Sequence, residues 1–213
     1  MRVERFNVGP FDNNLYLLTS TGSKDAIVVD PSMESAHVLE EIRSRGLNVR
    51  RILLTHAHVD HVVMVRAFHE ATGAPVWLHA DDRLLYERAR DQAAAMGLAW
   101  PGSVPVAHWM KEGEDVGIPG IDVRALHTPG HSPGSITFAT PEGLIVGDVL
   151  FHGGIGRTDL PGGSWDILLR TIRERLFPYP PETNVYPGHG ALTTIGHEMA
   201  SNPFVGAHAL QNP

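Results

Sequence analysis

The residues best suited to chemistry are gathered in one stretch, His56 to His61, which reads HAHVDH and holds three histidines and one aspartate. It follows the apolar run RILLT at 51–55, which we predict to be a buried strand. If the backbone stays extended past this run, His56, His58 and Asp60 point the same way, because strand side chains alternate with a period of two. His61 follows where a helix can start. The pattern predicts that imidazoles and a carboxylate converge at a strand end.

Imidazole and carboxylate groups are ligands of divalent metals such as zinc, manganese and iron. Four donors within six residues are more than one tetrahedral ion easily takes from so short a loop. The stretch 56–61 therefore predicts two adjacent metal ions at one strand end. A lone histidine on a strand is more often a surface or core residue than a ligand, but four donors in this spacing favour the metal interpretation.

Three later stretches each place one further candidate ligand beside a predicted strand end. His131 lies in the turn HTPGHSPG at 127–134, which contains two prolines and two glycines. Asp148 follows the apolar run LIVG, and His189 lies in YPGHG. Glycine neighbours let the backbone approach closely and leave space for a ligand. Together with the stretch 56–61, they supply five histidines and two aspartates, enough for two metal ions and a bridging water.

The composition narrows the class of protein. The chain has 213 residues, which suffices for a buried core, and we expect a single domain over 1–213. Hydrophobic residues make up 42% and charged residues 19%, which is ordinary for a globular protein. The net charge of -7 argues against nucleic acid or an anionic membrane as the main partner.

Cysteine is absent, so disulfides, thiol catalysis and thiolate metal sites are excluded, and a metal must be held by His, Asp or Glu. The start MRVERFN lacks the apolar stretch of a signal peptide. The sequence also has no apolar run approaching the roughly 18 residues of a membrane span. We therefore expect a cytoplasmic protein with no membrane partner.

Periodicity and turn residues predict a succession of strands and helices. Strands are expected at 2–8, 14–19, 26–30, 51–55, 75–79, 115–118, 121–127, 135–140, 143–147 and 183–187. Helices are expected at 34–45, 62–72, 81–96 and 164–177, the third capped by Asp81. Residues 97–113 are expected to be a loop that could line the site entrance, and the chain after 187 an irregular tail. Strands with interspersed helices in both halves favour an α/β (α+β) fold of two mixed sheets face to face, flanked by helices.

The order of the motifs resembles that of the metallo-β-lactamase-fold hydrolases: H-x-H-x-D-H, T-P-G-H-S-P-G-S, G-D and P-G-H-G. Further stretches resemble the short, single-domain bacterial branch of the glyoxalase II (hydroxyacylglutathione hydrolase) group. These are GDVLF at 147–151, GRTD at 156–159, TTIGHE at 193–198 and NPF at 202–204. The resemblance covers nearly the whole chain and implies an αββα sandwich with the metals at one edge.

The resemblance also implies how the seven candidate ligands divide between two metals. The first metal would be bound by His56, His58 and His131, the second by Asp60, His61 and His189, and both would share Asp148. Zinc is the expected metal, with iron or manganese as alternatives. Asp148 is expected to be catalytic through its bridging position, and Asp60 to orient the nucleophile and accept its proton.

Several residues depart from the family pattern. Val63 and Met64 stand where the family usually has two glycines, so local packing or pocket shape should differ. Arg157 and Asp159 fall near a lysine and a tyrosine of the glutathione-handling enzymes. They could bind a substrate carboxylate, or they could pair with each other. Residues 190–213 contain no Lys or Arg, so we expect weak recognition of glutathione.

The remaining singled-out histidines are predicted to have no catalytic role. His127 is expected to be structural or to support His131. For His79, His152 and His197, packed or surface positions are favoured over positions that line the pocket.

The function predicted from these observations is a metal-dependent hydrolase of small-molecule thioesters, using hydroxide formed from a water that the two metals share. One alternative is a persulfide dioxygenase, in which His56, His131 and Asp148 would hold a single iron. A lactonase or other ester hydrolase would use the same two metals. A purely structural metal domain is disfavoured, because structural sites are normally closed by four protein ligands. The sequence leaves the oligomeric state open.

Overall fold

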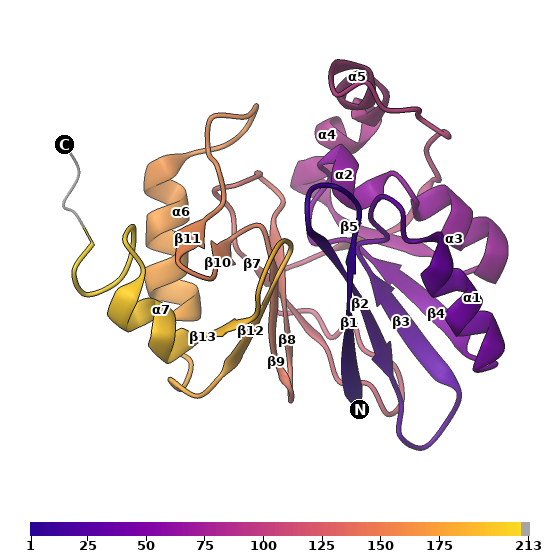
Figure 1. Ribbon diagram of the computed structural model, residues 1–213, viewed down its shortest axis with the longest axis horizontal. Helices are drawn as coiled ribbons and strands as arrows, with labels where there is room; N and C mark the ends of the chain where they lie inside the picture. Colours follow the sequence, from indigo (N-terminus) through magenta and orange to yellow (C-terminus); the bar gives the residue numbers. More distant parts are fainter. Residues whose placement is uncertain (210–213) are drawn as a thin grey trace.

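Two β-sheets lie face to face in the computed structural model, which describes residues 1–209, and helices cover their outer faces (Figure 1). The first sheet follows chain order: β1 (Arg2–Val8), β2 (Asn13–Thr19), β3 (Asp25–Val29), β4 (Asn48–Leu53), β5 (Val76–His79) and β6 (Val106–Met110). The second sheet has the order β13 (Thr193–Thr194), β12 (Asn184–Pro187), β9 (Gly143–Gly147), β8 (Ile136–Thr140) and β7 (Arg124–His127).

Both sheets are mixed. In the first sheet β1 to β3 pair antiparallel and β3 to β6 pair parallel. In the second, β9 and β12 are parallel and the other pairs antiparallel. Parallel strands need crossover connections, and helices supply several of them. The predicted αββα sandwich is confirmed.

The helices divide between the two outer faces (Figure 1). Those on the side of the first sheet are α1 (Ala36–Ser44), α2 (Val59–Val62), α3 (Val65–Thr72), the 3-10 turn η1 (Ala80–Asp82), α4 (Arg83–Glu87) and α5 (Ala89–Ala95). Those on the side of the second sheet are α6 (Trp165–Thr171), its π-helical continuation η2 (Ile172–Leu176) and α7 (Ile195–Ser201). A short hairpin, β10 (Leu150–Phe151) and β11 (Gly154–Ile155), lies beside them.

Strand β2 shows why the sandwich has a core on each side of a sheet. Its alternate residues Leu15 and Leu17 join the apolar cluster under the helices. Tyr16 and Leu18 join the cluster between the two sheets, with Phe138 from β8 among its members. Because strand side chains alternate, a strand in the middle of a sandwich is buried on both faces and reads as a continuous apolar run.

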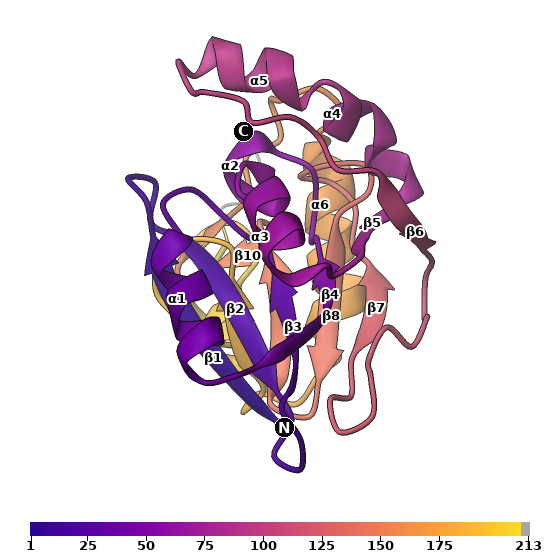
Figure 2. The same cartoon turned by 90° about the vertical axis from the view of Figure 1, so that its right-hand side faces the viewer.

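Some sequence predictions of the first half were wrong. The predicted loop 97–113 contains β6, whose edge position leaves much of it partly exposed, so its apolar pattern is weak (Figure 2). The predicted helix 81–96 is divided into α4 and α5, with Arg88 between them. Asp81 does not cap it, because the ring of His79 accepts the hydrogen bond from the Asp81 N–H at the start of η1.

Other predicted elements differ in their extent. The predicted strands 115–118 and 121–127 contain regular pairing only at β7, together with two isolated bridges. The predicted helix 62–72 corresponds to α3, which begins three residues later at Val65, and the separate helix α2 shares only Val62 with the predicted range. The chain after 187 is not irregular throughout, since it forms β13 and α7. Within residues 1–209, none of the helices combines the length and the hydropathy needed to cross a membrane.

Val63 and Met64, which replace two glycines of the family pattern, lie at the junction of α2 and α3. Val63 is buried in a small apolar cluster with Ala93 of α5, and Met64 packs against the same cluster. Trp100, from the segment after α5, also packs there. The two bulky side chains thus fill a contact between α2 and the α5 region, which explains how they are accommodated.

Candidate metal centre

Helix α2 presents part of the HAHVDH stretch. Strand β4 ends at Leu53, and His58 is the extended N-cap residue of α2. Asp60 and His61 therefore lie in the first turn of a helix, and the prediction of an extended chain through residue 60 was wrong. A helical turn nevertheless brings them toward the same centre as His56. In Figure 1, α2 lies near the upper ends of the two sheets.

A first group of imidazoles joins this stretch to the turn after β7. The rings of His56 and His58 lie 4.8 and 4.5 Å from the ring of His131, measured between centroids. His58 Nδ1 is 2.8 Å from His131 Nε2. All three side chains are buried, and one nitrogen from each lies within 4.8 Å of the others. This group could hold one metal ion.

A second group combines α2 with the chain after β12. His61 Nε2 lies 3.1 Å from His189 Nε2. Asp60 Oδ2 lies 3.4 Å from His61 Nε2 and 3.3 Å from His189 Nε2. These three ligand atoms also lie within 4.8 Å of one another. This group could hold a second ion.

The carboxylate of Asp148, just after β9, lies between the two groups. Its Oδ2 is 3.6 Å from His131 Nε2 and 3.3 Å from His189 Nε2, while its Oδ1 is 3.4 Å from His61 Nε2. A single side chain thus contacts ligand atoms of both groups, which is the position expected of a bridging ligand. All seven residues predicted from the sequence are brought together.

Hydrogen bonds fix the orientation of the imidazoles. His131 Nδ1 lies 2.8 Å from the carbonyl oxygen of Arg157, and His189 Nδ1 lies 2.7 Å from that of Phe11. A carbonyl oxygen can only accept, so each Nδ1 donates. In the neutral ring each Nε2 then keeps its lone pair, directed at the centre.

Asp30, directly after β3, orients two further rings. Its Oδ2 accepts from His61 Nδ1 over 3.2 Å and from Thr55 Oγ1 over 2.6 Å. Because the Thr55 hydroxyl gives its proton to Asp30, its oxygen accepts from His56 Nδ1, 2.9 Å away. Asp30 has a left-handed φ of 49° and is buried. Asp30 was not among the residues predicted from the sequence, although it follows an apolar strand as Asp148 does.

Unpartnered polar atoms gather at this centre. Within residues 1–209, His56 Nε2, His58 Nε2 and Asp148 Oδ1 are buried without a hydrogen-bond partner. A buried polar atom without a partner costs free energy, and native structures contain few of them. His58 turns Nδ1 toward His131, so its Nε2 lies on the other side of the ring, whereas His56 Nε2 and Asp148 Oδ1 are atoms that a divalent cation would satisfy. The donor set is therefore compatible with two metal ions.

The electrostatics of the first group favour neutral rings. Burial lowers the pKa of His56 well below its ordinary value, and the neighbouring His61 adds to this effect. Burial, together with nearby His131, lowers the pKa of His58 to about 4. Neutral imidazole is the form that binds a metal.

In the second group the histidines hold protons when no metal is present. Burial alone would lower the pKa of His189, but hydrogen bonds to Asp148 and Asp60 raise it to about 10. Burial opposes charge on Asp148 as well, yet the charges on His61 and His189, whose Nε2 atoms face its oxygens, hold its pKa well below the usual range. A metal ion must displace these protons.

Glycine is required beside the centre at Gly188. A Cβ atom at this position would lie 2.1 Å from Asp148 Oδ1 and 2.9 Å from His61 Cε1. Neither neighbour can move without leaving the centre, so a side chain at 188 would displace a candidate ligand.

The other residues singled out from the sequence lie outside this arrangement. The guanidinium of Arg157 makes a two-pronged ion pair with Asp159 over 2.8 and 2.7 Å, and both side chains are exposed. His79 and His127 stack with ring centroids 4.2 Å apart, and their nitrogens approach the Asp81 carboxylate. His127 Nε2 already donates to the carbonyl oxygen of Pro133 over 2.8 Å, so that nitrogen is not free for a metal.

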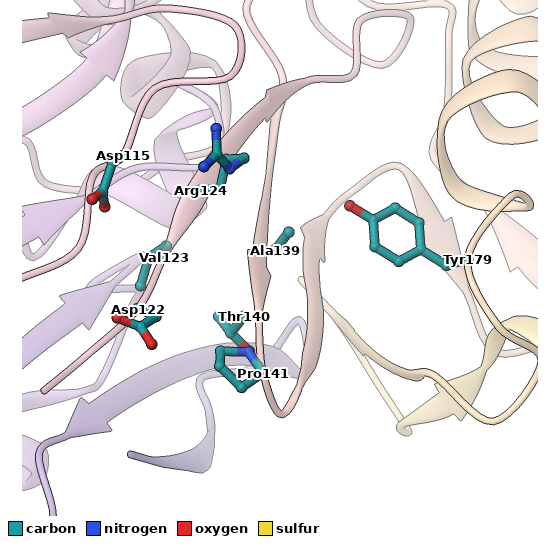
Figure 3. A pocket seen from close by; sticks show the side chains of 8 residues that line it. All are labelled: Asp115, Asp122, Val123, Arg124, Ala139, Thr140, Pro141 and Tyr179. Atoms are coloured by element: carbon teal, nitrogen blue, oxygen red, sulfur yellow. The ribbon is translucent and has the colours of Figure 1, made fainter.

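Two further histidines, His152 and His197, stack with ring centroids 4.8 Å apart, and neither belongs to a candidate metal group within the described residues. A hollow of about 380 Å³ lies elsewhere, bordered by Asp115, Arg124 and Tyr179 among others (Figure 3). No candidate ligand lines this hollow, so it is separate from the centre.

The family follows from a comparison with known proteins. The family model described as the Metallo-beta-lactamase superfamily matches residues 8–189. The chain belongs to this superfamily. Among curated relatives, hydroxyacylglutathione hydrolase GloC of Haemophilus influenzae is 37% identical over 209 residues, covering 96% of this chain and 98% of the relative.

Two solved structures are also similar over nearly their whole length. TTHA1623, crystallised in a di-iron-bound form, is 42% identical, with a TM-score of 0.85 over 95% of this chain and 100% of the other. The B3 metallo-beta-lactamase BLEG-1 is 34% identical, with a TM-score of 0.87 over 96% of this chain and 99% of the other. The predicted family resemblance is confirmed, and the relatives support a metal-dependent hydrolase. The family and the His/Asp ligand groups support binding of divalent metal ions, and one of the similar structures contains two iron ions.

Proposed function

We propose that this protein hydrolyses small-molecule thioesters of the hydroxyacylglutathione type at a centre of two divalent metals. The observation that carries the proposal is the shared position of Asp148 between two groups of ligand atoms, in a chain whose relative over nearly full length is a hydroxyacylglutathione hydrolase. When bound, two divalent ions lower the pKa of a shared water and polarise the substrate carbonyl.

Asp60 is the residue placed to handle the proton of the attacking water. Asn13 Nδ2 donates to Asp60 Oδ2 over 3.0 Å, which leaves the other oxygen of this carboxylate for a further interaction. The charge of His61 and the hydrogen bond to His189 lower the pKa of Asp60 despite its burial, so its carboxylate stays ionised and can accept a hydrogen bond that orients the attacking water. Asn13 lies in β2 and is fully buried, and it was not among the residues predicted from the sequence.

A thioester suits this arrangement because a thiolate leaves with little need for a general acid. We expect weak recognition of glutathione because Arg157, the candidate substrate-binding residue, is paired with Asp159. The guanidinium of Arg157 is occupied by Asp159 through two hydrogen bonds and is not free for a substrate carboxylate. A lost charge-assisted hydrogen bond forfeits about 1.5–3 kcal/mol, which corresponds to roughly tenfold or more in affinity.

The proposal is tested by hydrolysis assays on protein loaded separately with zinc, iron or manganese. The substrates are S-lactoylglutathione and the same acyl group on a smaller thiol. Turnover of both thioesters with similar efficiency, abolished by a chelator, is the expected result. A strong preference for the glutathione thioester would contradict the weak recognition, and no thioester turnover with any metal would refute the function.

The same preparations distinguish the alternatives. An oxygen electrode follows glutathione persulfide, because the GRTD run at 156–159 also suits a persulfide dioxygenase. Hydrolysis of a β-lactam is measured because one similar structure is a B3 metallo-beta-lactamase. A lactone and a simple ester complete the set. Iron-dependent oxygen uptake without thioester turnover would replace the proposal with the dioxygenase.

A further inference from the structure

A buried carboxylate outside the seven candidate ligands connects the two segments that carry the first group. Asp82, at the end of η1, has no exposed surface. Its Oδ2 accepts from the backbone N–H of Ala57 over 2.9 Å and from Ser132 Oγ over 2.8 Å. Its Oδ1 accepts from the N–H of Gly134 over 2.6 Å. None of these donors belongs to the element that carries Asp82.

The positions of the donors relate Asp82 to the metal centre. Ala57 lies between His56 and His58, and Ser132 directly follows His131. One carboxylate therefore bonds to both segments that bear the three imidazoles. Asp82 accepts no hydrogen bond from Asp60, His61 or His189 of the second group.

The approach is close enough to need glycine at the turn. A Cβ atom at Gly134 would lie 2.6 Å from the Asp82 backbone nitrogen and 2.8 Å from its Cβ. Across the part of the chain that the structure describes, Asp82 has no ion-pair partner, so its charge is stabilised by the three donors. Hydrogen bonds to an ionised acceptor are stronger than those between neutral groups.

We propose that Asp82 is a positioning residue that sets the spacing of His56, His58 and His131 before a metal binds. This inference rests on the proposed metal centre but not on the identity of the substrate. It goes beyond the ligands themselves, since Asp82 touches none of the three rings through a hydrogen bond. The expected consequence is a selective loss of metal affinity at the first group.

The Asp82→Asn variant is chosen because it keeps the size of the side chain and breaks one side of the connection. An amide has one oxygen, so its NH₂ group must face either the N–H of Gly134 or the N–H of Ala57. Ser132→Ala removes one donor and leaves the Ala57 and Gly134 bonds. Asp81→Asn makes the same substitution at the adjacent, exposed residue and is the matched control.

The two groups are isolated by background substitutions in the full chain. His189→Ala leaves the first group intact, and His58→Ala leaves the second intact. Metal-free protein is titrated with zinc against a chelator of known affinity. In the His189→Ala background, Asp82→Asn is expected to weaken zinc binding about 10–100-fold, the usual effect of removing a group that orients a ligand. In the His58→Ala background, the loss should stay below about threefold.

In the His189→Ala background, Ser132→Ala is expected to lower the zinc affinity of the first group by a smaller factor, about three- to tenfold. Asp81→Asn should leave both affinities unchanged. If Asp82→Asn does not fold, the zinc affinities of Ser132→Ala in the two backgrounds are compared instead, and a loss confined to the His189→Ala background supports the positioning role. Equal losses in both backgrounds, or no loss at the first group, would overturn the positioning role.

The experiment separates this inference from the proposed function. Zinc binding is read without substrate, so a chain that binds two ions but does not hydrolyse thioesters still tests Asp82. If neither background binds zinc, the metal centre and the inference fall together.

Discussion

Thr55 donates its hydroxyl proton to Asp30 Oδ2 over 2.6 Å, and this bond determines how His56 faces the metal centre. With its proton directed at Asp30, the Thr55 oxygen accepts from His56 Nδ1 and leaves His56 Nε2 unprotonated. The same carboxylate accepts from His61 Nδ1. Asp30 and Thr55 thus set one ring in each of the two candidate metal groups.

Replacing Thr55 by valine should weaken metal binding, because valine keeps the shape of the side chain and removes the acceptor for His56. A loss of about 10–100-fold in zinc affinity is expected, measured by competition with a chelator. Thr55→Ser is the matched control, since it retains the hydroxyl and should bind zinc nearly as well as the native chain. Equal affinity in the valine and serine variants would show that the hydroxyl does not orient the ring.

Removal of a candidate ligand should abolish hydrolysis without unfolding the chain. Asp148→Ala and His58→Ala are predicted to fall to background activity with metal in excess, while circular dichroism stays close to that of the native protein. The core supports this expectation, because β3 and β4 bury apolar side chains independently of the centre. Bound metal stabilises the native state by about 2.7 kcal/mol at a concentration 100 times its Kd, so melting temperatures should fall. Either variant retaining near-native activity would contradict the ligand assignment.

The number of metal ions bound per chain should also fall when a candidate ligand is removed. Active native protein is expected to contain two metal ions per chain by elemental analysis, and His58→Ala or His189→Ala one. An active, fully loaded native sample with a single ion per chain would count against a dinuclear centre.

The seven candidate ligands could be predicted from the sequence because their residue types are restricted by chemistry and their positions follow apolar strands. Residues that support them carry weaker signals. Asp82 falls within a stretch that resembles the start of a charged surface helix, and only the packing of η1 against the His131 turn shows its role. Asn13 is the first of two adjacent asparagines at the start of β2, a pair that reads as the turn residues before a strand.

In the fold, too, some elements could be predicted from the sequence and others could not. The central strands could be predicted because burial on both faces makes them continuously apolar, as in β2 and β9. The edge strand β6 could not, since edge burial leaves no clear alternation in a segment rich in proline and glycine. At His58 the extended chain turns into α2, whose Val59 packs with Ala93 of α5. This contact joins residues far apart in the sequence, so the local pattern of residues does not predict the turn.

The stability of the metal-free protein should fall as pH rises between about 6.5 and 10. His189 has a pKa raised from its ordinary 6.5 to about 10, so its protonated form stabilises the folded state below pH 6.5. That contribution is lost as pH rises through the folded pKa. Urea unfolding of chelator-treated protein across this range measures the effect. His189→Ala should reduce the dependence, with the remainder due to His61, whose pKa the neighbouring carboxylates also raise, and a native curve that is flat or rises would contradict it.

Gly188→Ala is predicted to destroy the centre, because the new methyl group would lie 2.1 Å from Asp148 Oδ1. Activity should drop to background, and zinc affinity should fall with it. Gly154→Ala is the control in the nearby hairpin, where an added Cβ meets only an ordinary 3.6 Å contact with Phe151. It should retain most of the activity. Zinc binding by Gly188→Ala equal to that of the native chain would show that the backbone there can shift freely.

The ion pair between Arg157 and Asp159 is expected to limit selectivity for the glutathione part of the substrate. Both groups are exposed, and Asp159 occupies the guanidinium with two hydrogen bonds. Asp159→Ala should free Arg157 for a carboxylate of glutathione and lower the KM for S-lactoylglutathione about tenfold, since a charge-assisted hydrogen bond contributes about 1.5–3 kcal/mol. The KM for the same acyl group on a smaller thiol should not change. The double variant Arg157→Ala with Asp159→Ala should lose the gain, which distinguishes a freed guanidinium from a general loosening of the loop. An equal change for both thioesters, or a gain that survives without Arg157, would show that this arginine does not recognise the thiol part of the substrate.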